Sequence, residues 1–358
     1  MRPKHQEISE LLRRRISNGH YLTASFPGER TLAKELGVSH MTGRRVIRDL
    51  VDVDVLRRLD NGRITINERA ATLRNKLQVG FVTPAYPSES LNKWWLSLRA
   101  EVERRHGIAR MIPYLDWDDP TVWAAVNGDM DRIFIIPPSD LPRLLLERLV
   151  AARHKVVSMF VNLTDHGVCG IDGGAIGNLD KLFDHLAAQG HRRVDCFNSQ
   201  PQNRKITEHI AYWQQALAAR GLEGELHNDP VPSFGHPAAH ARLRMNALLR
   251  RGAFHATAVY CVTVAAAKGV MRGLADHGLR IGRDVAVCSF GGGDEARMMV
   301  PSLTTVDTPD PAPVIGQAID RLQTQRRDSP AWFLRPENVG LFVGETTRPD
   351  EAGAEPLP

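Results

Sequence analysis

The sequence of 358 residues contains no apolar run of the roughly 18 residues that a membrane-spanning helix needs. Its first residues, MRPKHQEISELLRRR, lack the apolar core of a secretory signal, so we expect a cytoplasmic protein. Cysteine is scarce, and none of Cys169, Cys196, Cys261 and Cys288 stands in a CxxC pair or at metal-ligand spacing from a histidine. The sequence therefore predicts four buried free thiols, and neither a metal site nor a cofactor.

Motifs of enzyme active sites are missing as well. The sequence has no GxSxG nucleophile elbow and no HExxH metal motif. The glycines at 291–293 follow a strand-like run, but the lysine and serine or threonine of a phosphate-binding loop do not follow them. The sequence therefore predicts a protein without enzymatic activity.

The formal net charge of +5 hides an uneven distribution along the chain. Residues 1–76 contain 16 basic and 9 acidic residues, a charge of +7, whereas the remaining 282 residues carry a charge of −2. Such asymmetry is typical of a chain in which one segment meets a polyanion and a larger segment does not.

The basic segment carries the pattern of a winged helix-turn-helix. Apolar side chains at helical spacing predict helices around residues 8–16, 31–36 and 40–53. Ser39 can cap the third of these helices. Two β-prone runs then flank Asn61-Gly62, and this arrangement is a strong local signal for a hairpin.

In a winged helix-turn-helix, the third helix enters the major groove of DNA, and the wing reaches a flanking backbone or the minor groove. Polar side chains at the start of that helix can meet base edges, while arginines farther along suit phosphates or guanine. The third helix and its cap hold Ser39, His40, Thr42, Arg44, Arg45 and Arg48, and the wing adds Gly62 and Arg63.

Residues 5–66 resemble the N-terminal domain of GntR-type transcriptional regulators. The resemblance rests on the run FPGERTLAKELGVSHMTGRRVIRDL at residues 26–50 and on the hairpin that follows it. By matching position, the resemblance implies DNA contacts from Arg30, His40, Thr42 and Arg44, and a wing tip at Gly62.

Two positions depart from the pattern of the GntR family. His40 stands where arginine is frequent, and Gly43 stands where an apolar residue is usual. The first departure predicts an altered base preference, and the second predicts a looser recognition helix. The alternative for the whole segment is a basic helical hairpin that contacts another protein.

From Gln78 onward, apolar runs of strand length alternate with helical stretches. Continuous apolar strands followed by helices favour parallel sheets covered on both faces, so the fold class is α/β. The segment is long for one such sheet, which predicts two lobes. We therefore expect a winged helix-turn-helix at 1–66, a linker at 67–77, a two-lobed ligand-binding and dimerisation domain at 78–347 and a flexible tail at 348–358.

The two-lobed segment is similar to the periplasmic-binding-protein-like sensor of LacI/GalR-type repressors. Its most specific pieces are GIDGGAIG at 170–177, GLRIGRDVAVCSF at 278–290 and PSLTTVDTP at 301–309, in family order. The resemblance implies a small-molecule effector bound in a cleft between the lobes, at the carboxyl ends of the strands. The candidate effector contacts are Tyr86, Trp94, Trp95, Asp172, His209, Trp213, Phe290 and Asp307.

Three polar anchors that LacI/GalR-type sensors use for sugars are replaced in this chain. His209 aligns with the pocket arginine, while Val264 and Gly291 align with two aspartates. Because each lost hydrogen bond costs about 1 kcal/mol, the effector is either not a typical sugar or no longer bound.

These features predict a transcriptional regulator, a repressor that binds operator DNA as a homodimer. A small molecule, sugar-like or a divergent metabolite, is expected to modulate that binding. Two alternatives remain open: a cytoplasmic solute-binding module, and an enzyme on the same α/β fold.

Overall fold

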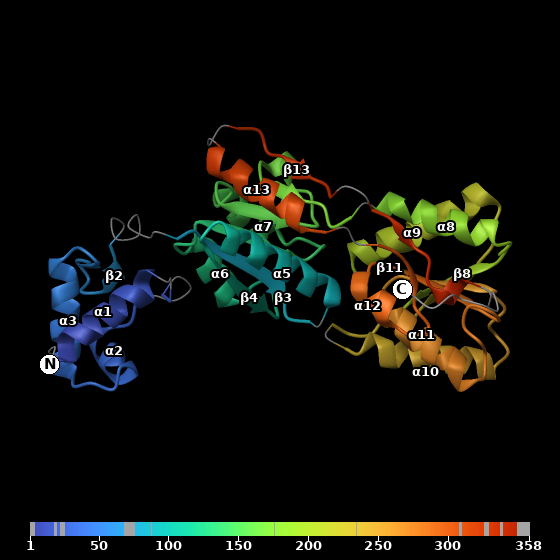
Figure 1. The fold of residues 1–358 in the computed structure, drawn as a ribbon, viewed down its shortest axis with the longest axis horizontal. Helices are drawn as coiled ribbons and strands as arrows, with labels where there is room; N and C mark the ends of the chain where they lie inside the picture. The colour runs from blue at the N-terminus through green and yellow to red at the C-terminus, as the bar shows by residue number, and fades with distance from the viewer. Residues whose placement is uncertain are drawn as a thin grey trace, which may run out of the picture.

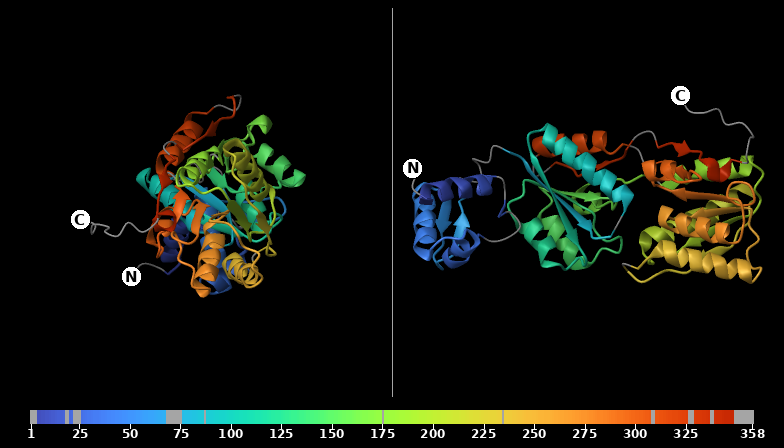
Figure 2. Two further views of the ribbon diagram at one scale, coloured as in Figure 1. Left: turned by 90° about the vertical axis from the view of Figure 1, so that its right-hand side faces the viewer. Right: turned by 60° about the horizontal axis from the view of Figure 1, so that its bottom comes forward.

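Three bodies follow one another along the chain: a small N-terminal head and two larger α/β lobes (Figures 1 and 2). The structure is a computed structural model that describes residues 4–17, 20–21, 26–67, 76–86, 88–174, 176–233, 235–307, 310–325, 329–336 and 339–348. Most of the expected linker at 67–77 and of the expected tail at 348–358 lies outside these ranges.

The head consists of three helices and a two-stranded wing, as the sequence predicts. Its elements are α1 (Lys4–Ser17), α2 (Glu29–Glu35), α3 (His40–Asp52), β1 (Leu56–Arg58) and β2 (Ile64–Ile66). The two strands are antiparallel, with Leu56 opposite Ile66. Leu12, Leu32 and Ile47 from the three helices pack with Leu56 in one buried cluster, so the wing and the third helix share a core.

The first lobe is built on a six-stranded parallel sheet in the order β13-β7-β6-β5-β3-β4. Its strands are β3 (Gln78–Pro84), β4 (Ile108–Tyr114), β5 (Arg132–Ile135), β6 (Val156–Met159), β7 (Cys169–Ile171) and β13 (Phe333–Leu334). One face packs on α5 (Glu89–Arg104) and α13 (Ala312–Thr324), and the other packs on α6 (Pro120–Asn127) and α7 (Arg143–Ala151). Burial on both faces explains the continuous apolar strands.

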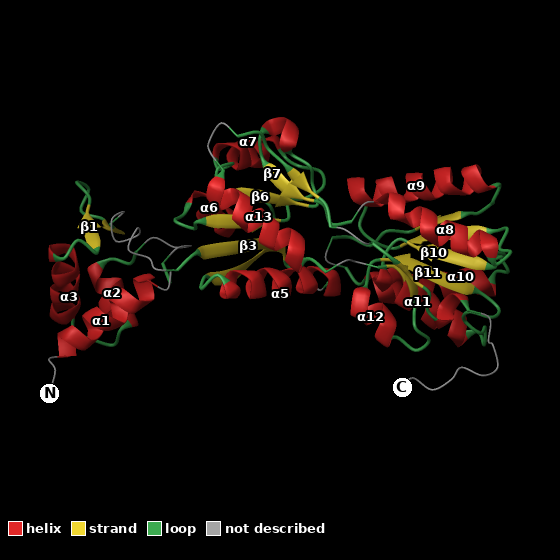
Figure 3. Ribbon diagram, turned by 45° about the horizontal axis from the view of Figure 1, so that its top comes forward, coloured by secondary structure: helices red, strands yellow, loops and turns green. Residues whose placement is uncertain are grey.

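The second lobe repeats this plan, with helices on both faces of its sheet (Figure 3). Its strand order is β14-β12-β11-β10-β8-β9. Its strands are β8 (Val194–Asn198), β9 (Leu226–Asn228), β10 (Ala258–Cys261), β11 (Ala286–Phe290), β12 (Thr304–Val306) and the antiparallel β14 (Leu341–Phe342). Its helices are α8 (Leu179–Ala188) and α9 (Arg204–Arg220) on one face, and α10 (Pro237–Arg250), α11 (Val264–Asp276) and α12 (Gly293–Met298) on the other. Three short 3₁₀ turns complete the lobes at η1 (Thr164–His166), η2 (Ile176–Asn178) and η3 (Glu345–Thr347).

The chain passes between the two lobes three times, after β7, after β12 and after β13. All three connections leave from the carboxyl end of a strand in a parallel ladder. The carboxyl ends of both sheets therefore face the junction between the lobes, where α/β sheets of this kind bind ligands.

Composition-based expectations can be compared with the structure directly. All four cysteines are buried and free, as predicted. In the part of the chain that the structure describes, no helix is long and apolar enough to cross a membrane. The same residues contain no cluster of three or more histidine, cysteine or acidic side chains arranged to hold a metal ion.

Candidate functional site

The third helix of the head presents opposite faces to the core and to solvent. Val46, Ile47 and Leu50 are buried in the head. At about 100° per residue, the exposed side chains between residues 40 and 48 fill a single arc of about 140° on the other side. This arc holds His40, Met41, Arg44, Arg45 and Arg48. The predicted recognition helix therefore offers solvent a continuous basic face.

Side chains on three elements organise the start of this helix. Ser39 caps it, because its Oγ accepts a hydrogen bond from the Thr42 amide at 3.2 Å, and the two hydroxyls lie 2.8 Å apart. His40 Nε2 lies 3.8 Å from a carboxylate oxygen of Glu29, and the other oxygen accepts a hydrogen bond from Arg58 at 2.7 Å. Glu29 of α2 thus connects the recognition helix to the wing.

Gly43 contributes to the contact between α2 and α3. It is buried against α2, and a Cβ placed on it would lie 3.0 Å from Ala33 Cβ and 3.3 Å from the Glu29 carbonyl oxygen. The missing side chain therefore lets α2 and α3 approach closely, which keeps Glu29 beside His40.

A bulkier residue at position 43 is expected to separate the two helices. We expect Gly43→Val to destabilise the head by about 1–3 kcal/mol, because the added atoms meet backbone and Ala33 rather than a flexible side chain. Faster amide hydrogen exchange along α2 and α3 measures this loss. Gly340→Val is the matched control, since its Cβ would meet nothing within 4 Å and it lies outside the head. Unchanged exchange in Gly43→Val would contradict this packing role.

The wing adds the remaining predicted DNA contacts. Gly62 has a φ of +76°, a conformation that favours glycine, and its amide donates to the Leu59 carbonyl at 2.8 Å. The Arg63 amide donates to the Asn61 side chain at 3.0 Å, which fixes the backbone of the wing turn, and the Arg63 side chain is exposed. Arg30 is exposed on α2. Among all the predicted DNA contacts of the head, Thr42 alone is half-buried.

Two of the predicted effector contacts meet at the junction of the lobes. The rings of His209 on α9 and Phe290 at the end of β11 lie edge to face, with centroids 4.8 Å apart. His209 Nδ1 lies 2.8 Å from the hydroxyl of Tyr260, which is fully buried in β10. A neutral imidazole has one donor and one acceptor nitrogen. The contact with Tyr260 uses Nδ1 and leaves Nε2 for a further hydrogen bond.

Burial keeps His209 uncharged. Desolvation, with a smaller contribution from Lys205, lowers the pKa of His209 from 6.5 to about 4. A histidine whose pKa is lowered by folding contributes stability above its unfolded pKa, and that contribution is lost as the pH falls.

We therefore expect acidification from pH 7 to pH 4 to remove about 2–3 kcal/mol of stability through His209. The comparison is between unfolding curves of the wild type and of His209→Gln, followed through tryptophan fluorescence at each pH. The variant should lose less stability over this range, because it has no imidazole to protonate. Parallel losses in the two proteins would assign the acid sensitivity to other groups.

The two predicted carboxylates at the junction are both paired with arginines. Asp172 directly follows β7, and its Oδ2 lies 3.4 Å from Arg335 Nε. Asp307 directly follows β12 and accepts a hydrogen bond from Arg297 at 2.6 Å, while the Arg297 guanidinium lies 4.2 Å from the Phe342 ring centroid. A ligand here would meet balanced ion pairs rather than bare carboxylates.

Two of the predicted effector contacts are core residues instead, so these predictions are wrong. Trp94, a residue of α5, is 2% exposed and packs in the apolar core of the first lobe. Trp213 is 3% exposed in the core of the second lobe, and its indole N–H donates to the Val194 carbonyl at 3.0 Å. Trp95 is half-buried with its ring 5.9 Å from that of Phe81, and Tyr86 is 48% exposed after β3.

Three further residues near the junction were not among the predicted effector contacts. Tyr260 fixes His209, and Arg335 pairs with Asp172, but both contacts are long-range and leave no local motif. Phe160 has a φ of +68°, which is uncommon for a bulky residue, and its ring fills the space that a Cβ on Gly173 would need. The successive glycines at 173 and 174 were the available signal for such a close approach.

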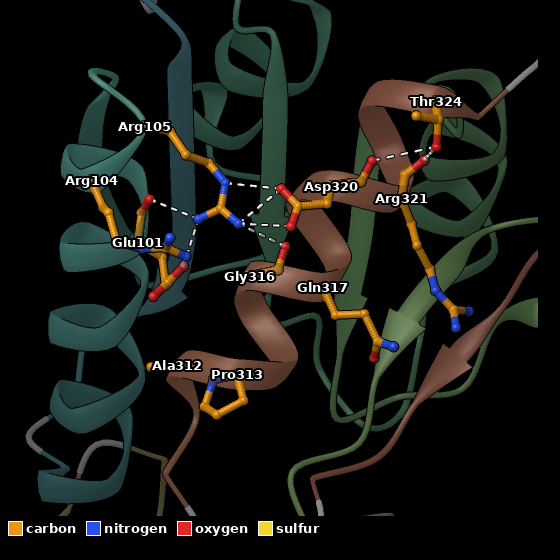
Figure 4. Close-up of a pocket in the computed structure, with 10 residues that line it drawn as sticks. All are labelled: Glu101, Arg104, Arg105, Ala312, Pro313, Gly316, Gln317, Asp320, Arg321 and Thr324. Carbon is orange, nitrogen blue, oxygen red and sulfur yellow. Dashed lines mark hydrogen bonds and ion pairs between the residues drawn. The ribbon is translucent and has the colours of Figure 1, made fainter.

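A cavity of about 520 Å³ lies elsewhere, between α5 and α13 of the first lobe (Figure 4). None of the predicted effector contacts lines it. Arg105 forms its wall and donates to Asp320 at 2.8 and 2.9 Å, to Glu101 at 2.5 Å and to the Gly316 carbonyl at 3.2 Å. Because these bonds are satisfied within the protein, we assign Arg105 to holding α13 against α5.

Comparison with known proteins identifies both parts of the chain. Residues 4–66 match the family described as bacterial regulatory proteins, gntR family, and residues 183–336 match the periplasmic binding protein-like domain. The chain thus joins a GntR-type helix-turn-helix head to a periplasmic-binding-protein-like α/β domain, and the predicted fold class is confirmed.

Individual proteins are similar to parts of this chain. The HTH-type transcriptional regulator GalR of Escherichia coli (strain K12) is 31% identical over 126 residues, which cover 35% of this chain and 36% of GalR. The alignment thus spans about a third of that relative's length.

The lac repressor dimer bound to operator and the anti-inducer ONPF has a TM-score of 0.63 at 19% identity, over 79% of this chain and 98% of that one. A LacI family regulator, CCPA from Weissella paramesenteroides with bound sucrose, has a TM-score of 0.60 at 16% identity, over 76% and 98%. These structures share the fold.

Proposed function

We propose that this chain, a GntR-type head joined to a periplasmic-binding-protein-like body, is a transcriptional regulator that represses genes by binding operator DNA. The exposed arc of α3 carries the proposal. Arg44, Arg45 and Arg48 project from the helix whose opposite face is buried, and the wing lies against the same core. Guanidinium groups on such a helix suit phosphates and guanine edges in the major groove.

We also propose that the regulator is a cytoplasmic homodimer that catalyses no reaction. A two-fold dimer places its two heads on a near-palindromic site, with the half-sites about one helical turn of DNA apart or a multiple of it. The lac repressor of similar fold is a dimer on its operator, which supports this arrangement.

A small molecule bound at the junction of the lobes is proposed to control operator affinity. The similar structures of the lac repressor and CCPA hold an anti-inducer and sucrose, respectively. In this chain, neutral His209 and the Phe290 ring favour an uncharged ligand group over a carboxylate or phosphate. Control requires that the ligand bind the DNA-competent and DNA-incompetent states with different affinity.

Selection of genomic DNA fragments by the purified full chain at about 50 mM salt tests the proposal. We expect a few fragments to be enriched that share an inverted repeat, and a competitor with scrambled half-sites to bind more weakly. A thermal-shift screen of metabolites then identifies effectors, which should change the affinity for the enriched fragment. Failure to retain any fragment would contradict the proposed function.

A further inference from the structure

We propose that Met41 reads the C5 methyl group of a thymine in the operator half-site and is therefore a specificity-determining residue of the head. The inference rests on the proposed function, because it requires that α3 enter the major groove. It concerns a residue that neither the motif nor the charge pattern singled out.

Met41 is strongly exposed although it is apolar. It is 70% exposed, compared with 42% for Leu11 and 49% for Val53, the other large apolar side chains that the described residues of the head expose. It does not belong to the apolar cluster that the described head residues form. Folding of the head therefore does not account for a methionine at this position.

The helical arc places Met41 among the arginines. At about 100° per residue, Met41 lies between the directions of Arg48 and Arg45, and one turn before Arg44 and Arg45 along the helix. These arginines can hold the DNA backbone on both sides of the groove, so a side chain between them points toward the base edges. Met41 is thus on the face that DNA would cover.

Its neighbours at the start of the helix are already engaged. The hydroxyls of Ser39 and Thr42 lie 2.8 Å apart, and His40 faces the Glu29 carboxylate at 3.8 Å. Among the first residues of α3, Met41 offers an apolar surface that no contact of the described head covers.

The thymine methyl group is the apolar feature that bases present in the major groove. A flexible and polarisable thioether suits contact with it, since methionine adapts to irregular apolar surfaces. Burial of one methyl group corresponds to an affinity gain of about 3- to 10-fold. The same chemistry would accept 5-methylcytosine, which carries its methyl group at the same ring position.

The test replaces each thymine of the selected operator in turn with deoxyuridine, which lacks only the methyl group. For the wild type, we expect one symmetric pair of replacements, which removes a methyl group from each half-site, to weaken binding by about 10- to 100-fold. Met41→Ala should bind the thymine operator more weakly by a similar factor and lose no further affinity on the same replacement. Met41→Leu should retain part of the methyl dependence.

The matched control is Met298→Ala, which removes an equally exposed methionine from the second lobe, 80% exposed, and should behave as the wild type. Equal binding of thymine and deoxyuridine operators by the wild type at every position would overturn the inference while leaving operator binding intact. A dependence on the thymine methyl group that persists in Met41→Ala would also overturn the inference. If the full chain binds no DNA, the proposed function fails first and the inference with it.

Discussion

Between 50 and 200 mM NaCl, the affinity of the full chain for its operator is expected to fall by about 10³- to 10⁵-fold. Residues 1–76, which comprise the head and nearly all of the expected linker, carry a charge of +7, and the rest of the chain carries −2, so the attraction to phosphates is concentrated at this end of the chain. Exposed arginines on all three of its helices and on the wing are available for these contacts. They include Arg13, Arg30, Arg44, Arg45, Arg48, Arg57 and Arg63. Two such heads in a dimer can reach the 6–10 phosphate contacts that produce a loss of about this size.

A single arginine should account for a measurable share of this salt dependence. Arg44→Ala is expected to weaken operator binding by about 10-fold or more and to reduce the slope of log K against log salt by about 1 for each head. The fold should be unaffected, because the Arg44 side chain is exposed.

Arg251→Ala serves as the control, since it removes an exposed arginine from the second lobe and leaves the head intact. Titrations of labelled operator at four or more salt concentrations give both slopes. An unchanged slope in Arg44→Ala would remove that residue from the phosphate and base contacts, and a flat salt dependence of the wild type would contradict the role assigned to the whole head.

Local sequence signals were sufficient to predict the helices and the wing of the head. Ser39 is a side-chain cap at the start of α3, and Gly62 supplies the positive φ of the wing turn, so both boundaries follow from the chemistry of one or two residues. The packing role of Gly43 could not be predicted locally, because it depends on α2. Only the packing of Ala33 against it shows that the missing side chain tightens this contact.

The fold class of the two-lobed body could be predicted from the sequence, but its individual residue contacts could not. Alternating strands and helices indicate parallel sheets, and the structure has two of them. The return of α13 and β13 to the first lobe depends on contacts across some two hundred residues, such as those between Arg105 and Asp320. Pairings of this range, including that of Asp172 with Arg335, leave no periodic pattern in the sequence.

The two misplaced tryptophans differ from these cases, because a signal for them was present. Ile206, Ile210, Trp213 and Leu217 are spaced by four, three and four residues, which is the buried stripe of a helix. Trp94, Leu98 and Val102 follow the same rule on α5. Family alignment placed both tryptophans near an effector, whereas helical phase directs their side chains into the cores.

Replacing Trp213 by alanine is accordingly expected to lower the free energy of unfolding by about 3–5 kcal/mol. The indole fills the core between α9 and the second sheet at 3% exposure, and its N–H satisfies the Val194 carbonyl. Removal leaves both a cavity and an unpaired buried acceptor. Urea unfolding followed by circular dichroism measures the loss without depending on the deleted fluorophore.

The neighbouring Tyr212→Ala separates a core role from a contact with the effector. Tyr212 is half-buried and its hydroxyl donates to Asp180 at 2.8 Å, so its removal should cost about 1 kcal/mol. If Trp213 is a core residue, Trp213→Ala should be much less stable than Tyr212→Ala. Trp213→Phe should then recover part of the lost stability, because phenylalanine refills part of the volume. A Trp213→Ala protein with normal stability that no longer responds to the effector would instead place the indole in the effector site. The expected order of stabilities follows from the face of α9 that each side chain occupies. His209 lies at the edge of the buried stripe formed by Ile206, Ile210, Trp213 and Leu217, and the same reasoning assigns it to the junction of the lobes.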